Sequence, residues 1–224
     1  MIFHQKLKDR QNVGNPQARI YEILILTKSA KHSALCIAGL DLDSNRLVRL
    51  VADASGKEIN GYDFRANETT IKILDKIQII GVEAPLKIQT ENIILHKINK
   101  IIGQCDLQTA NNIMSSVINN GDLLKTQDYA ISRLDIANYD KSLMIAEVRN
   151  FETKTITKMD GGQKRKARFM YEGLFYCDMS ITDPDYFNLK EEIQYDKCKI
   201  VLSLPEDDFN GKYFKFVAKV FPLA

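Results

Sequence analysis

The chain has 224 residues, of which 45% are hydrophobic and 27% are charged. These proportions are close to those of average globular proteins, and they exclude disordered, collagen-like and fibrous proteins. The formal net charge is only +2, from 31 Lys and Arg against 29 Asp and Glu, which excludes a protein coated uniformly in positive charge. Any affinity for nucleic acid must therefore come from local basic patches.

The cysteines and the apolar pattern indicate a cytoplasmic protein. The four cysteines lie far apart with no C-x-x-C pair, and the chain has only three histidines to complete a metal-binding set. We therefore expect reduced thiols and no metal site. No stretch approaches about 18 uninterrupted apolar residues, and charged residues stand where a signal peptide has its apolar run. The sequence thus predicts neither a membrane segment nor a signal peptide.

The first half of the chain begins with an arm and continues as strands. Residues 1–20 have no apolar period and carry four Lys and Arg against one Asp, which indicates a flexible basic arm. Short apolar runs follow at 21–27, 34–40 and 46–52. Each run is too short for a helix, so we expect strands. The alternation at 70–82 predicts one half-exposed strand or two short ones.

One helix interrupts the β pattern. Apolar residues recur at helical spacing from Leu107 to Ile118, with Asp106 placed to cap the amino end and Gly121 beyond the carboxyl end. A linker-like region at 123–140 precedes a second β-rich half. Because no βαβ spacing repeats, a Rossmann or TIM fold is disfavoured.

These patterns predict a mainly β protein with minor α structure, built as two small β-barrels in tandem. We expect the basic arm at residues 1–20, the first barrel and the connecting helix at 21–125, and the second barrel at 126–224.

The run LTKSAKHSALCIAG at 26–39 is the first candidate for a site. Its polar loop carries Lys28, Ser29, Lys31 and His32, which could place two cations, a hydroxyl and an imidazole on one anionic group. The alternative is a solvated hairpin loop whose lysines serve solubility. Ser29 and His32 have no identifiable orienting acid and no G-x-S-x-G elbow, so we expect no catalytic set.

The run KMDGGQKRKARFMY at 158–171 is the strongest electrostatic signal. One acidic residue, Asp160, is outnumbered by five cations: Lys158, Lys164, Arg165, Lys166 and Arg168. The Gly pair predicts a flexible hairpin tip, and basic mobile loops are suited to contacting phosphates. The aromatic residues Tyr171, Phe175 and Tyr176 either join the core or stand on an exposed face, where Tyr171 or Tyr176 would stack on bases.

Two further polar positions have competing interpretations. Asp183 either caps a short helix beginning at Pro184 or helps Asp185 to hold a cation. Two acids without a third are too few for a metal site, so we expect the cap. Asn92 either lies in a cleft between the barrels and contacts a base edge, or caps a turn. No P-loop, dinucleotide or H-E-x-x-H motif is present, and no cofactor is expected.

Several motifs occur in a recognisable order. ILTKSAKHSALCIAG and NRLVRLV are followed by Glu91 and Asn92, then by FMYEGLFYCDMSITDP, VLSL and FKFVAKVF. In this order the chain, from about residue 21 to 221, resembles the bacterial dual OB-containing domain family. The chain differs from the family pattern at Leu47 or Val48, where the family commonly has a Trp. The resemblance implies two OB-like barrels and, by analogy with OB folds, a nucleic acid or another anionic polymer as ligand, with no established catalytic activity.

We therefore expect a nucleic-acid-binding protein that captures single-stranded or structured DNA or RNA without catalysing a reaction. The cations expected to hold the phosphates are Lys28, Lys31, Arg46, Arg49 and those of the Lys164–Arg168 run. Two alternatives remain open. One is an enzyme or sensor acting on a nucleotide in the inter-barrel cleft, and the other is a module that binds a protein partner through an exposed apolar patch.

Overall fold

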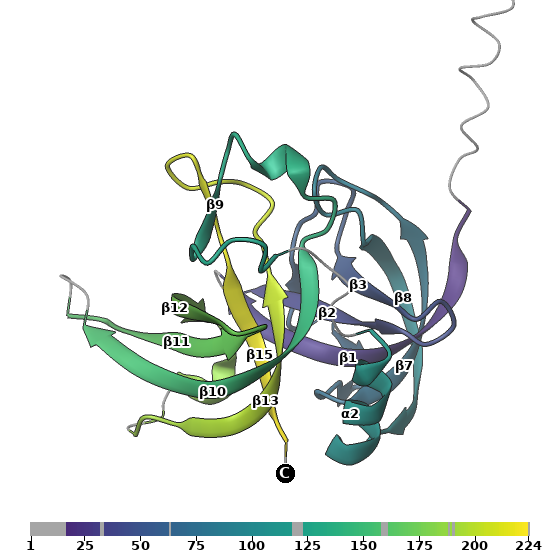
Figure 1. The fold of residues 1–224 in the computed structure, drawn as a ribbon. Helices are drawn as coiled ribbons and strands as arrows, with labels where there is room; N and C mark the ends of the chain where they lie inside the picture. Colours follow the sequence, from purple (N-terminus) through teal and green to yellow (C-terminus); the bar gives the residue numbers. More distant parts are fainter. Residues whose placement is uncertain are drawn as a thin grey trace, which may run out of the picture.

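The structure is a computed structural model that describes residues 17–31, 34–62, 64–117, 123–157, 161–187, 189 and 191–223. The first half contains β1 (Arg19–Lys31), β2 (Ala34–Asp41), β3 (Arg46–Val51), β4 (Ile59–Asn60), β5 (Arg65–Ala66), β6 (Thr69–Thr70), β7 (Asp75–Glu83), β8 (Asn92–Gln104) and α2 (Leu107–Ser115). The second half contains β9 (Ala130–Ser132), η1 (Ile136–Asn138), β10 (Leu143–Thr157), β11 (Gln163–Tyr171), β12 (Leu174–Ile181), η2 (Pro184–Tyr186), β13 (Gln194–Ser203), β14 (Lys212–Phe214) and β15 (Phe216–Pro222). Figure 1 shows these elements arranged as two β bodies.

The first body is a barrel of five strands in the order β1-β2-β3-β8-β7. It closes because β1 pairs antiparallel with both β2 and β7, while β3 runs parallel to β8. This is the Greek-key connectivity of an OB-fold. Buried aliphatic residues fill the interior, together with Phe64 from the segment between β4 and β5.

The second body repeats the same connectivity. Its closed barrel has the order β10-β11-β12-β15-β13, and β12 runs parallel to β15. An aromatic stack forms part of its interior, with the rings of Phe151 and Phe169 6.4 Å apart and those of Phe169 and Tyr176 5.5 Å apart. The prediction of a mainly β chain with two OB-like barrels is therefore confirmed.

Two residues of the first sequence motif shape β1 and β2. The β1–β2 register shifts between Ile25 and Thr27, and the Thr27 hydroxyl accepts a hydrogen bond from the Ala38 amide at 3.0 Å. At Gly39 a Cβ atom would lie only 2.5 Å from the Leu24 carbonyl oxygen. Glycine therefore allows the two backbones to approach each other as the barrel closes.

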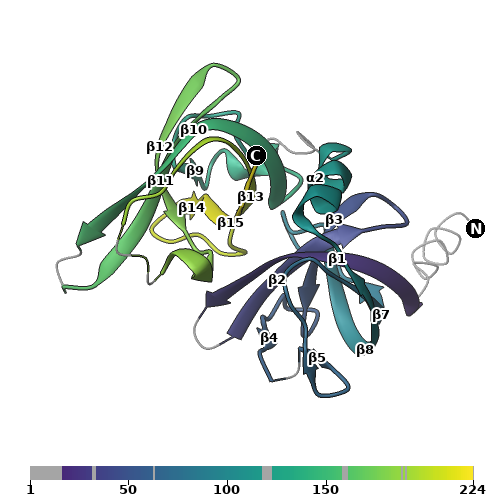
Figure 2. The same cartoon turned by 90° about the horizontal axis from the view of Figure 1, so that it is seen from below.

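An apolar interface joins the two barrels. Leu40 and Leu47 of the first barrel share a buried cluster with Leu143 and Val201 of the second, and α2 adds Met114 to it. Asp106 caps α2 by accepting a hydrogen bond from the Thr109 amide at 2.7 Å, as predicted. Figure 2 shows the barrels side by side with α2 at their junction. The helix ends at Ser115, and the predicted stop at Gly121 lies outside the described residues.

Two expectations about connecting segments need correction. The region at 123–140, predicted as a linker, contributes Leu123, Leu124, Ile131 and Tyr139 to the core of the second barrel. The basic run at 164–168 lies within β11, because β10 extends to Thr157 and the two strands pair from Thr157 opposite Gln163. Of the arm predicted at residues 1–20, residues 1–16 lie outside the described residues, whereas Arg19 and Ile20 begin β1. No helix in the described part of the chain is long and apolar enough to cross a membrane.

Candidate nucleic-acid interface

The outer face of the second and third strands is where OB-folds commonly bind oligonucleotides. In the first barrel these strands are β2 and β3, and their outward residues Ala38, Leu40 and Leu47 belong to the inter-barrel cluster. The second barrel and α2 therefore cover this part of the face, and the cleft between the barrels borders the rest. In the second barrel the equivalent strands are β11 and β12, which carry exposed residues on their outer side.

The two arginines predicted on β3 are engaged within the protein. Arg49 is buried, and its Nη2 donates to Ser142 Oγ at 2.8 Å and to the Leu204 carbonyl at 3.4 Å. The Ser142 hydroxyl in turn donates to the Glu91 carboxylate. Arg46 is exposed and pairs with Glu83 at 2.9 Å. Arg49 thus links the two barrels.

The predicted site at 28–32 is divided by strand geometry. Lys28 donates its ammonium group to the Ile71 carbonyl and lies 5.7 Å from the Phe64 ring, and burial lowers its pKa. Ser29 is buried and lines a cleft between the barrels. Neighbouring residues of a strand face opposite sides, so Lys28 and Ser29 are not brought together. The side chain of Lys31 and the whole of His32 lie outside the described residues.

Cations gather on the outer side of β11. Lys164, Lys166 and Arg168 alternate with inward-facing residues, as the period of a strand requires. Lys154 of β10 lies directly opposite Lys166 in the antiparallel register. Phe175 of β12, which pairs with Met170, is 49% exposed next to this row. We call Lys154, Lys164, Lys166, Arg168 and Phe175 the basic face.

The cations of the basic face differ in their contacts. Lys166 donates to the Asp178 carbonyl at 2.7 Å and to Ser180 Oγ at 3.1 Å, and burial lowers its pKa. Arg168 forms an ion pair with Glu152. Lys154 and Lys164 are exposed and form no hydrogen bond or ion pair with any part of the chain that the structure describes. The side chains of Lys166 and Arg168 are therefore held in place, whereas those of Lys154 and Lys164 are open to an anion.

Arg165 does not belong to the basic face. Its side chain is buried, and its guanidinium donates to the Leu189 carbonyl and to Thr153 Oγ1, the latter at 3.5 Å. The strand period turns this residue inward, between the outward Lys164 and Lys166. The expectation that all four cations of the run contact a ligand is wrong for Arg165 in this conformation.

The predicted stacking residues lie in the core. Tyr171 is 8% exposed and Tyr176 is 1% exposed, and the Tyr176 hydroxyl donates to the Leu124 carbonyl at 2.6 Å. Burial raises the pKa of both phenols, that of Tyr171 to about 12. Neither ring is open to a base. The exposed rings near this surface include Phe175 and Tyr129, of which Tyr129 is 40% exposed.

The sequence contained a signal for Phe175 but none for Tyr129. Phe175 is adjacent to Tyr176 in a strand, so only one of the two rings can face the core. Tyr129 lies in a segment whose sequence has no apolar period. Tertiary packing places its ring 5.7 Å from Lys166 Nζ.

The two polar candidates Asn92 and Asp183 have internal partners. Asn92 is buried and donates to Gln89 Oε1 at 3.3 Å, so it presents no edge to a base. Asp183 caps η2 by accepting from the Asp185 amide at 3.2 Å, which confirms the capping prediction.

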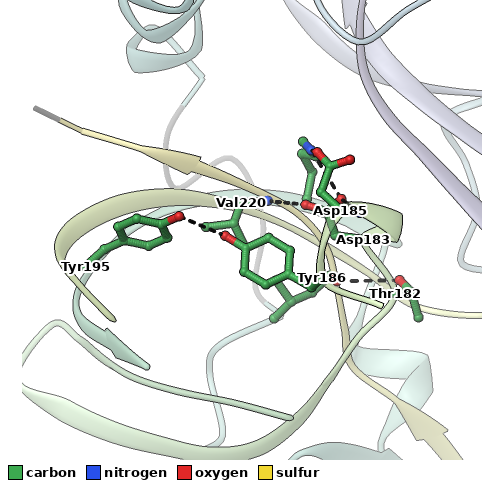
Figure 3. A network of polar contacts seen from close by, with 8 residues as sticks. Thr182, Asp183, Asp185, Tyr186, Tyr195 and Val220 are labelled. Atoms are coloured by element: carbon green, nitrogen blue, oxygen red, sulfur yellow. Dashed lines mark hydrogen bonds and ion pairs between the residues drawn. The ribbon is translucent and has the colours of Figure 1, made fainter. Parts of the chain in front are cut away.

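Asp183 also anchors β15. Its carboxylate accepts from Lys219 Nζ at 3.1 Å and from the Val220 amide at 3.2 Å, both in buried positions. Burial raises its pKa, although Lys219 acts in the opposite direction. Figure 3 shows Asp183 beside Val220, with Tyr186 and Tyr195 joined through their hydroxyls close by. Within the described residues no group of three or more His, Cys, Asp or Glu side chains is arranged to hold a metal ion.

A cleft of about 650 Å³ lies between the barrels. Its lining includes Arg49 and Ser29 from the first barrel and the aromatic residues Phe209, Phe214 and Phe216 from the second. A volume in this range and a largely apolar lining with a few polar groups are typical of small-ligand sites.

The chain is similar to one known protein family and, distantly, to solved structures. The family model described as Dual OB-containing domain matches residues 21–220. No curated protein matches significantly. One similar solved structure is described as "Crystal structure of Ifi202 HINa domain in complex with 20bp dsDNA", with 12% identity and a TM-score of 0.35, covering 92% of this chain and 100% of that chain.

A second similar structure is described as "Molecular basis for abrogation of activation of pro-inflammatory cytokines". It has 10% identity and a TM-score of 0.36, and the match covers 95% of this chain and 98% of that chain. Both structural similarities are too distant to carry an argument about function.

Proposed function

This chain belongs to the dual OB-containing domain family, and from that premise we propose that it binds DNA or RNA, as a single strand or at a structured single-stranded region, on the basic face. In this proposal the protein captures its ligand without catalysing a reaction. The bacterial source implied by the resemblance and a cytoplasmic location, in keeping with its free cysteines, belong to the same proposal.

The observation that carries the proposal is the open outer face of β11 and β12. The equivalent face of the first barrel is buried against the second barrel, whereas the basic face combines four outward cations with a half-exposed ring. Cations along a groove contact phosphates, and an aromatic ring stacks on bases of any sequence. Both elements of single-strand recognition are therefore present on one surface.

The residues of the basic face have different roles in this proposal. Lys154 and Lys164 contact phosphates directly, since both are exposed. Phe175 stacks on a base. Lys166, held by the Asp178 carbonyl and Ser180, keeps its charge fixed beside the strand path. Preorganised cations lose less side-chain entropy when a ligand binds.

A catalytic alternative lacks a convergent set of groups among the described residues. Lys28 and Ser29 face different sides of β1, and Asp183 is occupied by Lys219 and backbone amides. The remaining feature that favours a small ligand is the inter-barrel cleft.

The test compares K154A/K164A with K97A/K100A, a control that removes two exposed lysines from β8 of the first barrel. Fluorescence anisotropy would measure binding to single-stranded DNA, single-stranded RNA and duplexes across a range of salt concentrations. We expect the basic-face variant to bind more weakly and its slope of log K against log salt to fall by about 1.4, since each lost phosphate contact contributes about 0.7 for a single strand.

The control variant should retain the wild-type affinity and salt slope. Equal affinities and slopes for the two double variants would remove the basic face from the binding site. Failure of the wild-type protein to bind any of the three nucleic acids would reject the proposed function itself.

A further inference from the structure

A row of aromatic rings connects the basic face with the inter-barrel cleft. The ring of Tyr129 lies 5.7 Å from Lys166 Nζ, and its centroid is 5.9 Å from that of Phe214, with the planes inclined by 24°. The Phe214 ring lies 6.4 Å from that of Phe209. Phe209 and Phe214 both line the cleft. A strand that stacks along these rings is therefore led from the basic face to the cleft.

The rings are accessible along this row. Tyr129 is 40% exposed and Phe209 is 68% exposed. A large exposed ring costs hydrophobic free energy unless something covers it. Base–aromatic stacking tolerates any sequence, because every base has a π-face.

The charge of the cleft differs from that of the basic face. Its lining includes two cations, Arg49 and Lys57, and three carboxylates, Glu58, Glu206 and Asp207. Lys87 neutralises part of the negative charge from outside the lining, since its Nζ lies 3.0 Å from Asp207 and 3.8 Å from Glu206. Such a lining does not favour a phosphate, but carboxylates accept hydrogen bonds from hydroxyl groups.

We propose that the cleft receives the 3′-terminal nucleoside of the strand bound to the basic face. This inference rests on the proposed function. The base lies against Phe209 and Phe214, and the free 3′ hydroxyl donates to a carboxylate at the mouth, Glu206 or Asp207. A 3′ end that carries a hydroxyl fits, whereas a phosphorylated end of either polarity brings negative charge toward these carboxylates.

The volume agrees with this occupant. A cleft of about 650 Å³ lies in the range of sites that enclose ligands of nucleoside size. The protein therefore distinguishes a free strand end from the interior of a strand.

The experiment uses the full chain and three unlabelled competitors of one sequence: a linear oligodeoxynucleotide with a 3′ hydroxyl, the same strand with a 3′ phosphate, and its ligated circle. Each displaces a 5′-labelled strand in an anisotropy assay. We expect the 3′-hydroxyl strand to compete roughly tenfold better than the other two, the effect of about one stacked base. The circle and the 3′-phosphate strand should still bind through the basic face.

Three variants test the contacts. F209A should bring the 3′-hydroxyl strand down to the affinity of the circle, while Y62A, which removes a 79% exposed ring from the first barrel, should keep the wild-type preference. E206Q/D207N should reduce the discrimination against the 3′ phosphate. Phe209 and Tyr62 are both exposed, so neither substitution removes a core residue.

Equal competition by the circle and the 3′-hydroxyl strand would overturn the end-binding inference and leave the proposed function standing. The same conclusion would follow if F209A weakened all three competitors equally, because the ring would then contact only the interior of a strand. If K154A/K164A lost all binding while K97A/K100A kept the preference for the 3′-hydroxyl strand, end capture would depend on the basic face. That result would support the inference.

Discussion

Lys215 is a buried lysine that joins two segments of the second barrel. It is 1% exposed, and its ammonium group donates to the Thr126 carbonyl at 2.8 Å and to Thr126 Oγ1 at 3.1 Å. Burial lowers its pKa to about 8, against a weaker opposite effect of Asp128. This contact holds the segment before β9 against the junction of β14 and β15. The same segment carries Tyr129.

The lowered pKa makes the stability of the fold depend on pH. Between about pH 8 and the ordinary lysine pKa of about 10.4, folded Lys215 is neutral while the unfolded chain still binds the proton, so its contribution to stability rises with pH. We expect this contribution to change by up to about 3 kcal/mol. Chemical denaturation of wild type and K215M at pH 7.5, 9 and 10.5 measures the free energy of unfolding of each protein. The contribution of Lys215 is the difference between the two proteins in how this free energy changes with pH.

The pH dependence of K215M must be subtracted from that of wild type because Cys198 makes stability fall as pH rises. Burial raises the pKa of the Cys198 thiol to about 12, so the folded chain keeps a proton that the unfolded chain loses. The exposed residue Lys212 of β14 supplies the control, and K212M should show the wild-type pH dependence. Parallel curves for wild type and K215M would contradict the assigned titration of Lys215.

At the scale of a single element, the period of a strand decides which residues of β11 and β12 reach solvent. Lys164 and Lys166 point outward while Arg165 between them is buried, and Phe175 is exposed while Tyr176 is in the core. A cluster of similar residues along the sequence is thus divided into a binding set and a structural set. Composition alone does not distinguish the two sets, but in β11 one buried residue settles the phase of the whole strand.

We expect F175A to weaken single-strand binding by about 1–3 kcal/mol, since it removes a stacking ring, and to leave the melting temperature nearly unchanged, because the ring is 49% exposed. L174A is the matched control, as it removes a neighbouring side chain that is 47% exposed and not aromatic. Anisotropy and thermal unfolding measure the two effects. Equal losses of affinity in both variants would argue for a general apolar contact in place of stacking.

At the scale of the whole molecule, the packing of one barrel on the other determines which surface is free. Leu143 and Val201 of the second barrel cover Leu40 and Leu47 on the outer face of the first. Arg49, held by Ser142 and the Leu204 carbonyl, adds a polar contact across the same interface. The two barrels therefore share one buried interface, and we expect them to unfold together.

I145A tests this coupling, because Ile145 of β10 is fully buried in the inter-barrel cluster. We expect a loss of about 2–5 kcal/mol, as for other large-to-small core substitutions, within a single calorimetric transition. I156A on the outer part of the same strand, where the side chain is 36% exposed, should cost much less. Two separate transitions, with only one shifted by I145A, would show that the barrels unfold independently.

The sequence predicted the local features of this protein well. The alternating and continuous apolar runs indicated the strands, Asp106 and Asp183 were identified as caps, and the basic character of 164–168 was evident from composition. Each of these depends on interactions between residues that are close in the chain, so period, propensity and charge are sufficient to infer them.

Tertiary structure alone decided which of these features are accessible. Arg49 resembled an open cation, and it is buried because a second barrel packs on its strand. Tyr129 had no local signal, and its ring lies beside Lys166 of the basic face because Lys215 holds its segment in place. Such contacts join residues far apart in the chain, and no local pattern encodes them. The sequence by itself determined two barrels and a concentration of cations, whereas the docking of the barrels decided which face is open to a ligand.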